Sequence, residues 1–145
     1  MNITHFDKLQ NMYLNANINT QIFDTTKCKI ENKKATISLI ISDKYFHALG
    51  AIHGSVYFKL LDDAAFFAVN SIVEDVFVLT TSFNSNIIRP VSSGKIVAKG
   101  EVRFISKTLF IAESTLFNEK GKEIAFGSGH FVKSDVRLTE EIGYS

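Results

Sequence analysis

The sequence has 145 residues, 46% of them hydrophobic and 21% charged, and its net charge is +1. This balance is typical of a globular domain and excludes an intrinsically disordered chain. A nearly neutral chain also lacks the field that draws a protein to nucleic acid or to an anionic membrane, and its apolar runs are broken by charge before the ~18–20 residues that a membrane helix needs.

The N-terminal stretch predicts a short amphipathic helix over about residues 4–15. Thr4 and Asp7 match a capping box, and apolar residues then recur at helical spacing from Phe6 to Tyr13. The same stretch has neither the basic region nor the apolar region of a signal peptide. We therefore expect a cytoplasmic protein.

Two strand-like runs follow, at residues 20–31 and 35–42, with the polar residues 32–34 as a turn between them. The second run is rich in β-branched residues, and together the two runs predict a hairpin. Cys28 lies in the first run and is the only cysteine, which excludes an internal disulfide and favours a buried thiol over a nucleophile. Residues 43–52 have no clear period and are expected to form an ordered loop.

A buried helix is predicted over about residues 55–71. Its apolar side chains cover nearly all sides of the helix, and β-branched residues are almost absent after Val56. A helix that is apolar on most sides belongs in the interior of a protein rather than at its surface.

The second half of the chain predicts four more strands. They lie at about residues 76–89, 94–106, 108–118 and 122–133, with turn signals at 90–94 and 118–122. In the second of these strands, apolar residues alternate with Lys99, Glu101 and Arg103, as in an antiparallel strand with one face in water. We expect a four-strand meander, followed by a loose tail from Ser134.

These elements predict an α+β fold in which one long antiparallel sheet wraps around the buried central helix. The length fits a single domain over residues 1–145. Its core is expected at about residues 20–133, with the helix 4–15 before it and the loose tail 134–145 after it.

The segment 47–71 carries the residues best suited to chemistry. Gly54 stands at the predicted N-terminus of the helix, where an exposed amide can donate to a developing oxyanion with help from the helix dipole. Asp62 is a carboxylate among apolar side chains, which is costly unless the group is paired or used. Asp63 is its neighbour, and Lys59 is close enough in sequence to pair with either.

The run from Gly50 to Asp62, G-x-x-H-G-S-x(6)-D, resembles the G-x-x-H-G-G-x(6)-D signature of hot-dog thioesterases. The resemblance is to the phenylacetate-degradation and 4-hydroxybenzoyl-CoA thioesterase type. The strand ending in Arg-Pro and the run GKEIAFGSGHFV at 121–132 are also similar to that family. The resemblance covers about residues 35–133 and implies a hot-dog fold, which agrees with the order of elements derived above.

The resemblance also implies roles for individual residues. Asp62 matches the acidic residue that attacks the thioester or activates water, and the Gly54 amide matches the group that polarises the carbonyl. His53 matches the histidine that shapes this turn, and Thr80 matches a hydroxyl residue that positions the nucleophilic water. Two positions differ from the family pattern, because His47 stands where relatives often have asparagine and a serine replaces the second glycine.

Other interpretations remain open for Asp62, His53 and Thr80. The motif spacing selects Asp62 over Asp63, which leaves Asp63 as a helix-surface or interface ion. Without the motif, Asp62 also fits a structural carboxylate bonded to nearby amides. His53 also fits a helix cap, and Thr80 fits the polar surface of a strand.

Gly54 and Asp62 lie about 12 Å apart if they share one helix, because each helical residue rises ~1.5 Å. They cannot both contact one thioester carbonyl from the same subunit. If both act, Gly54 of one subunit meets Asp62 of another, so we expect a homo-oligomer, either a dimer or a dimer of dimers. The resemblance implies the same arrangement.

A group of cations follows the central helix, and consists of Arg89, Lys95, Lys99, Arg103 and Lys107. Such a strip could bind the phosphates of coenzyme A, with Arg89 and Arg103 as the candidates, and a solvated strand face is the alternative. No group of cysteines and histidines has the spacing of a zinc site. We expect no metal and no cofactor other than the coenzyme A of the substrate.

The leading hypothesis is an acyl-CoA thioesterase that hydrolyses a thioester to the free acid and coenzyme A, with Asp62 as general base or nucleophile. The alternative, motivated by His47 and by the serine after Gly54, is a non-catalytic module that binds or senses acyl-CoA. A dehydratase on the same fold is a third hypothesis, but such enzymes place a histidine and a carboxylate at other positions. No nucleic-acid or membrane partner is expected.

Overall fold

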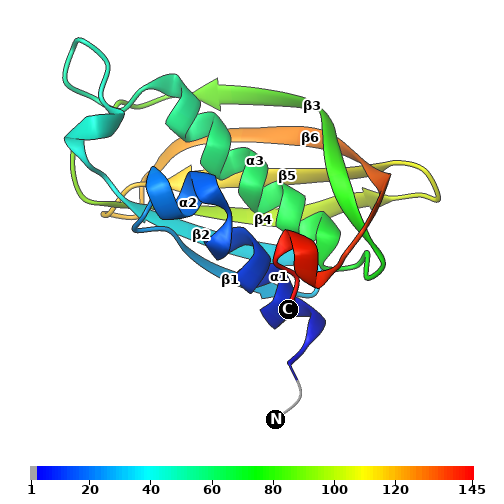
Figure 1. Cartoon of the computed structure of the whole chain (residues 1–145). Helices are drawn as coiled ribbons and strands as arrows, with labels where there is room; N and C mark the ends of the chain where they lie inside the picture. Colours follow the sequence, from blue (N-terminus) through cyan, green and yellow to red (C-terminus); the bar gives the residue numbers. More distant parts are fainter. Residues whose placement is uncertain (1–2) are drawn as a thin grey trace.

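The computed structural model describes residues 3–145, and these residues have the α+β arrangement that the sequence predicts (Figure 1). The α-helices are α1 (His5–Asn15), α2 (Asn17–Gln21) and α3 (Gly54–Asn70). The strands are β1 (Lys27–Glu31), β2 (Lys34–Ile40), β3 (Val76–Ile87), β4 (Lys95–Ile105), β5 (Phe110–Phe117) and β6 (Glu123–Arg137). The short 3-10 helices are η1 (Asp43–Tyr45) and η2 (Glu140–Ile142).

Within residues 3–145, the strands form one six-stranded antiparallel sheet in the order β1-β2-β4-β5-β6-β3. The sheet curves around α3, which confirms the predicted sheet wrapped around a central helix, and α1 and α2 lie beside α3 near the β1 edge (Figure 1). The two edges are unequal, because β3 has twelve residues and β1 has five. A long edge strand is the place where a second sheet can be added.

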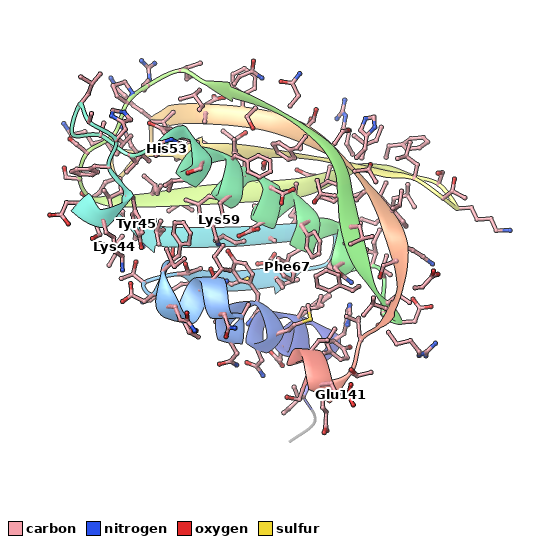
Figure 2. All side chains as sticks on the ribbon, turned by 45° about the horizontal axis from the view of Figure 1, so that its top comes forward. Lys44, Tyr45, His53, Lys59, Phe67 and Glu141 are labelled. Carbon is pink, nitrogen blue, oxygen red and sulfur yellow. The ribbon has the colours of Figure 1, made fainter. Side chains whose placement is uncertain are left out.

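The central helix is buried because its apolar side chains meet both the sheet and the N-terminal helices. Leu60, Leu61 and Ala64 have no exposed surface. On β4, a methyl group at Gly100 would overlap the main-chain carbonyl of Ala64, so the missing side chain lets the helix approach the sheet closely. Figure 2 shows Lys59 and Phe67 on the side of α3 that faces α1 and α2, with His53 at the start of the helix.

The first predicted strand is shorter than expected. Residues 20–31 were predicted as one strand, but α2 continues to Gln21 and β1 begins only at Lys27. The Asn19 side chain donates to the main-chain carbonyl of Tyr13 at 2.7 Å and stabilises the tight connection between the two helices. The β-branched residues around this segment favour a strand, but the hydrogen bonds of α2 and this contact with the preceding helix outweigh that preference.

The prediction of a four-strand meander is wrong in the position of one strand, β3. The strands β4, β5 and β6 are sequential neighbours, but β3 pairs with β6 rather than with β4. Residues 88–94 carry the chain across one end of the sheet, where the Val91 carbonyl accepts from Ile52 and the Gly94 carbonyl accepts from Ile41. The turn signal at 90–94 marks a reversal of the chain, but it does not say which strand becomes the neighbour.

The C-terminal tail was predicted to be loose from Ser134, but it packs against the rest of the fold. Strand β6 continues to Arg137 because it pairs with the beginning of the long strand β3, where Val76 faces Arg137. The last residues then return to α1, and the Tyr144 hydroxyl lies 2.7 Å from Nδ1 of His5. No helix among residues 3–145 is long and apolar enough to cross a membrane.

Candidate active site

Asp62 lies in the middle of α3 and is half-buried. Thr80 on β3 donates its hydroxyl proton to one carboxylate oxygen of Asp62 at 2.8 Å. Burial raises the pKa of the Asp62 carboxyl from its ordinary value of 3.8 to about 6, against the opposing effect of the Thr80 hydrogen bond. Asp62 is therefore a carboxylate that is ionised at neutral pH and is still basic enough to accept a proton.

A cavity of about 640 Å³ opens beside Asp62 and Thr80. Its wall comes from α1, the chain around α2, α3, β3 and η2, and it is largely aromatic, with Tyr13, Phe23, Phe58, Phe66, Phe67 and Phe77. A concave apolar cavity of this size with few polar groups is typical of a small-molecule site.

The start of α3 holds the second set of predicted residues. His53 is the N-cap of the helix, and its Nδ1 accepts from the main-chain N–H of Ser55 at 3.0 Å. The Ser55 hydroxyl lies 2.8 Å from the same nitrogen, so the serine that replaces the expected glycine is part of the cap. Gly54 is the first helical residue, and its amide belongs to the first turn, where N–H groups have no partner within the helix.

Gly54 and Asp62 do not face the same cavity within one chain. Gly54 lines a separate hollow of about 330 Å³ that it shares with His47, Tyr57 and Arg89. His47 is exposed in the loop before the helix, and its Nδ1 accepts from the main-chain N–H of Leu49 at 3.1 Å. The structure thus brings together Asp62 with Thr80, and Gly54 with His47 and His53, in two distinct places.

The two arginines predicted to bind phosphate are also separated. Nε of Arg89 donates to the main-chain carbonyl of Glu123 at 3.1 Å, at the sheet end where β6 begins. The register places this end beside Val97 of β4, whereas Arg103 is exposed near the other end of that strand, about 20 Å away at ~3.3 Å per residue. A single phosphate group cannot contact both side chains within one chain.

A polar cluster around Lys59 and Asp63 was not predicted from the sequence. Asp63 was expected to be a helix-surface or interface ion, but its carboxylate accepts from Lys59 at 2.7 Å and from the Tyr13 hydroxyl at 2.6 Å. The spacing of Lys59 and Asp63 by one helical turn was a visible signal of their pairing. The contribution of Tyr13 was not visible, because it depends on how α1 packs on α3.

A sequence profile of the thioesterase superfamily matches residues 49–125, which include Gly54, Asp62 and Thr80. The chain belongs to the thioesterase superfamily. A search of the curated proteins finds no match to the sequence. The family resemblance that the G-x-x-H-G-S-x(6)-D motif indicated is thereby confirmed.

Solved structures show the same fold for this thioesterase-superfamily member. The PaaI protein of the phenylacetic acid degradation operon of E. coli has a TM-score of 0.81 at 19% identity, over 94% of this chain and 100% of that one. A mutant thioesterase enzyme from Staphylococcus aureus has a TM-score of 0.72 at 22% identity, over 81% and 98%. A mutant thioesterase from Pseudomonas aeruginosa has a TM-score of 0.73 at 18% identity, over 88% and 94%. The sheet around α3 is therefore a hot-dog fold.

Proposed function

We propose that this thioesterase-superfamily member is an acyl-CoA thioesterase, which hydrolyses a thioester to a free acid and coenzyme A. The observation that carries the proposal is the Asp62 carboxylate, held by Thr80 at the edge of an apolar cavity in a member of this superfamily. One carboxylate oxygen accepts from Thr80, and the other takes no hydrogen bond from residues 3–145. That second oxygen is available to act on water or on the substrate.

Asp62 serves as general base or as nucleophile. As a base, it takes a proton from the water that attacks the thioester carbonyl, and the thiolate of coenzyme A leaves. As a nucleophile, its free oxygen attacks that carbonyl, the C–S bond breaks and the thiolate of coenzyme A leaves, and water then hydrolyses the resulting anhydride to the free acid and the Asp62 carboxylate. In both routes Asp62 works in its ionised form, and a pKa of about 6 keeps it largely ionised at pH 7 and above.

The amide that stabilises the oxyanion comes from Gly54 of a neighbouring subunit in this proposal. Gly54 and Asp62 of one chain stand about 12 Å apart along α3 and line different cavities. A Cβ atom at Gly54 would meet only Ile87 Cδ1 at 3.5 Å, an ordinary contact, so crowding within the chain does not account for the glycine. In this proposal, the glycine leaves room for a substrate that is held beside Asp62 of a second subunit. The long edge strand β3 offers the surface on which that subunit packs.

The cavity beside Asp62 and the hollow at Gly54 differ in lining, which indicates how the substrate lies in this proposal. The cavity beside Asp62 is lined mainly by aromatic and aliphatic side chains, which favours an apolar acyl group, aromatic or fatty. Arg89 shares the Gly54 hollow and is therefore a better candidate than Arg103 for a phosphate of coenzyme A. His53 supports the Gly54 amide as a helix cap, and His47 borders the same hollow.

The test is thiol release from a panel of acyl-CoAs, including benzoyl-CoA and octanoyl-CoA, by the wild-type protein and by Asp62→Asn. Asparagine keeps the size of the side chain and an oxygen for the Thr80 hydrogen bond, but it removes the base. Hydrolysis should fall at least about a hundredfold, the usual scale of general-base catalysis, while the oligomer persists. Binding of acyl-CoA without hydrolysis by the wild type would instead favour the non-catalytic module, and retained activity in Asp62→Asn would remove Asp62 from this role.

A further inference from the structure

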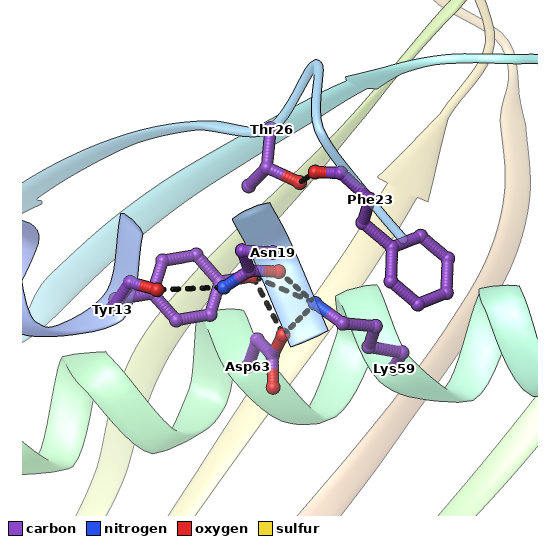
Figure 3. Close-up of polar contacts among 6 residues, drawn as sticks. All are labelled: Tyr13, Asn19, Phe23, Thr26, Lys59 and Asp63. Carbon is purple, nitrogen blue, oxygen red and sulfur yellow. Dashed lines mark hydrogen bonds and ion pairs between the residues drawn. The ribbon is translucent and has the colours of Figure 1, made fainter. Parts of the chain in front are cut away.

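A polar cluster of Tyr13, Asn19, Lys59 and Asp63 lies between α3 and the two N-terminal helices (Figure 3). These residues line the same cavity as Asp62. At the centre of the cluster, the Lys59 ammonium donates to the Asp63 carboxylate at 2.7 Å, to the Asn19 amide oxygen at 2.9 Å and to the Tyr13 hydroxyl at 3.1 Å. The Lys59 side chain is 11% exposed and that of Asp63 is 19% exposed. The ion pair is therefore largely shielded from bulk water, and dissolved salt screens the attraction between its charges less than it would for an exposed pair.

The hydrogen-bonding capacity of Lys59 is fully used inside this cluster. An ammonium group has three N–H donors, and each of them has a partner among Tyr13, Asn19 and Asp63. Burial and the nearby Asp63 hold the pKa of Tyr13 well above its usual value, so its hydroxyl stays neutral. Lys59 has no free donor for a substrate, and it acts on the site through its charge and by tying α1 and α2 to α3.

The charged groups that act on Asp62 are Asp63 and Lys59, both on its own helix. Burial is the largest influence on the pKa of Asp62 and raises it, and the Thr80 hydrogen bond lowers it. Of the two charges, that of Asp63 raises this pKa and that of Lys59 lowers it. Cys28 faces this pair from β1, and burial raises its pKa to about 12, which keeps the thiol neutral.

Among residues 3–145, the elements other than α3 contribute no charged side chain to the lining of this cavity. The lining residues of β3 are Phe77 and Thr80, and η2 contributes Ile142. Beneath α3, Ser114 of β5 donates to the main-chain carbonyl of Leu61 at 2.7 Å and is neutral as well. Besides burial and the Thr80 hydrogen bond, the charges of Lys59 and Asp63 are therefore the influences on the pKa of the carboxylate that we propose to be catalytic.

We propose that Lys59 and Asp63 are positioning residues whose opposite charges cancel beside Asp62, so that Asp62 stays ionised over the pH range in which the enzyme works. This inference rests on the proposed function, because it takes Asp62 as the acting carboxylate. Neither residue needs to touch the substrate. Lys59 cancels a charge that the neighbouring carboxylate would otherwise impose on the site.

The test compares Lys59→Met, Asp63→Asn and the double variant, all in the full-length protein. Lys59→Met leaves Asp63 uncompensated and should raise the pKa of Asp62 by about one pH unit, the usual effect of one nearby charge. Asp63→Asn leaves Lys59 uncompensated and should lower that pKa by a similar amount. The double variant removes both charges and should return the pKa close to its wild-type value. Lys59→Arg is the matched control, because it keeps the charge.

Two readouts follow the same carboxyl group. The first is an NMR titration of protein labelled with ¹³C-aspartate, in which the Asp62 resonance is assigned by its absence in Asp62→Asn. The second is the acid limb of the pH–rate profile for octanoyl-CoA hydrolysis, which should move in parallel. A merely structural role for the cluster predicts losses of stability or activity in both single variants, without opposite shifts that cancel.

Shifts in one direction, no shifts, or a double variant that does not return towards the wild type would each overturn the proposal. If Lys59→Met fails to fold, Asp63→Asn must still lower the pKa of Asp62. The pKa of Asp62 in the double variant must then be higher than in Asp63→Asn. The NMR titration does not depend on turnover. A wild-type protein that hydrolyses no acyl-CoA would therefore reject the proposed function, whereas the titration alone decides whether the charge pair acts on Asp62.

Discussion

Replacing Asp62 by asparagine should make the protein more stable at neutral pH. Burial raises the pKa of this carboxyl from 3.8 to about 6 in the folded state, so the fold favours the neutral form. A group of this kind contributes its full stability below pH 4, and the contribution is lost as the pH rises through 6. A difference of about two pH units corresponds to about 3 kcal/mol at pH 7. Asparagine is neutral at every pH and still accepts the Thr80 hydrogen bond.

The assay is urea unfolding of the wild type and Asp62→Asn at pH 7 and at pH 4, at one fixed protein concentration because assembly also affects stability. We expect a gain of about 3 kcal/mol in the free energy of unfolding at pH 7 and less than about 1 kcal/mol at pH 4. Asp63→Asn is the control on the same helix, and it should lower stability because it breaks the ion pair with Lys59. An Asp62→Asn variant with no gain at pH 7, or with an equal gain at pH 4, would refute the reasoning.

Three further predictions concern separate parts of the structure. Thr80→Val removes the hydrogen bond that lowers the pKa of Asp62, so the acid limb of the pH–rate profile should move to higher pH; an unchanged profile would contradict this. Gly100→Ala places a methyl group against the Ala64 carbonyl and should lower the free energy of unfolding by about 1–3 kcal/mol, and wild-type stability in urea would speak against this close approach. Burial raises the pKa of Cys28 to about 12, so a thiol reagent at pH 8 should label the folded protein far more slowly than the chain in urea; equal rates would be the contrary result.

Much of the fold follows from local patterns in the sequence. The apolar character of residues 55–71 predicted the buried helix, which the structure has as α3. The alternation around Lys99 and Glu101 predicted which face of β4 meets water, and both side chains are exposed. The pairing of β3 with β6 and the ordered C-terminus did not follow, because they depend on where residues 88–94 cross the sheet and on contacts such as His5 with Tyr144.

The candidate site divides in the same way. The motif indicated Asp62, Gly54 and His53, and counting along the chain indicated Thr80, which the structure places in a hydrogen bond with Asp62. The cluster around Lys59 was not predicted beyond its helical spacing. Its partners Tyr13 and Asn19 come from the N-terminal helices, and no local pattern reports how those helices dock on α3.

The central claim is that Asp62 of one subunit works with the Gly54 amide of another, and hybrid oligomers test it directly. Gly54→Pro removes the amide N–H at the first helical position, where proline is tolerated. His53 before it has φ −65° and ψ 148°, a conformation that suits a residue preceding proline. The second variant is Asp62→Asn, and each variant alone should be inactive.

Equal amounts of the two variants are unfolded together, refolded, and assayed for release of coenzyme A. Random pairing makes half of the dimers hybrid, and one of the two sites in each hybrid combines an intact Asp62 with an intact Gly54 from the other chain. The mixture should therefore recover about a quarter of the wild-type activity. A mixture that shows no more activity than the two separate variants would contradict a site shared between subunits.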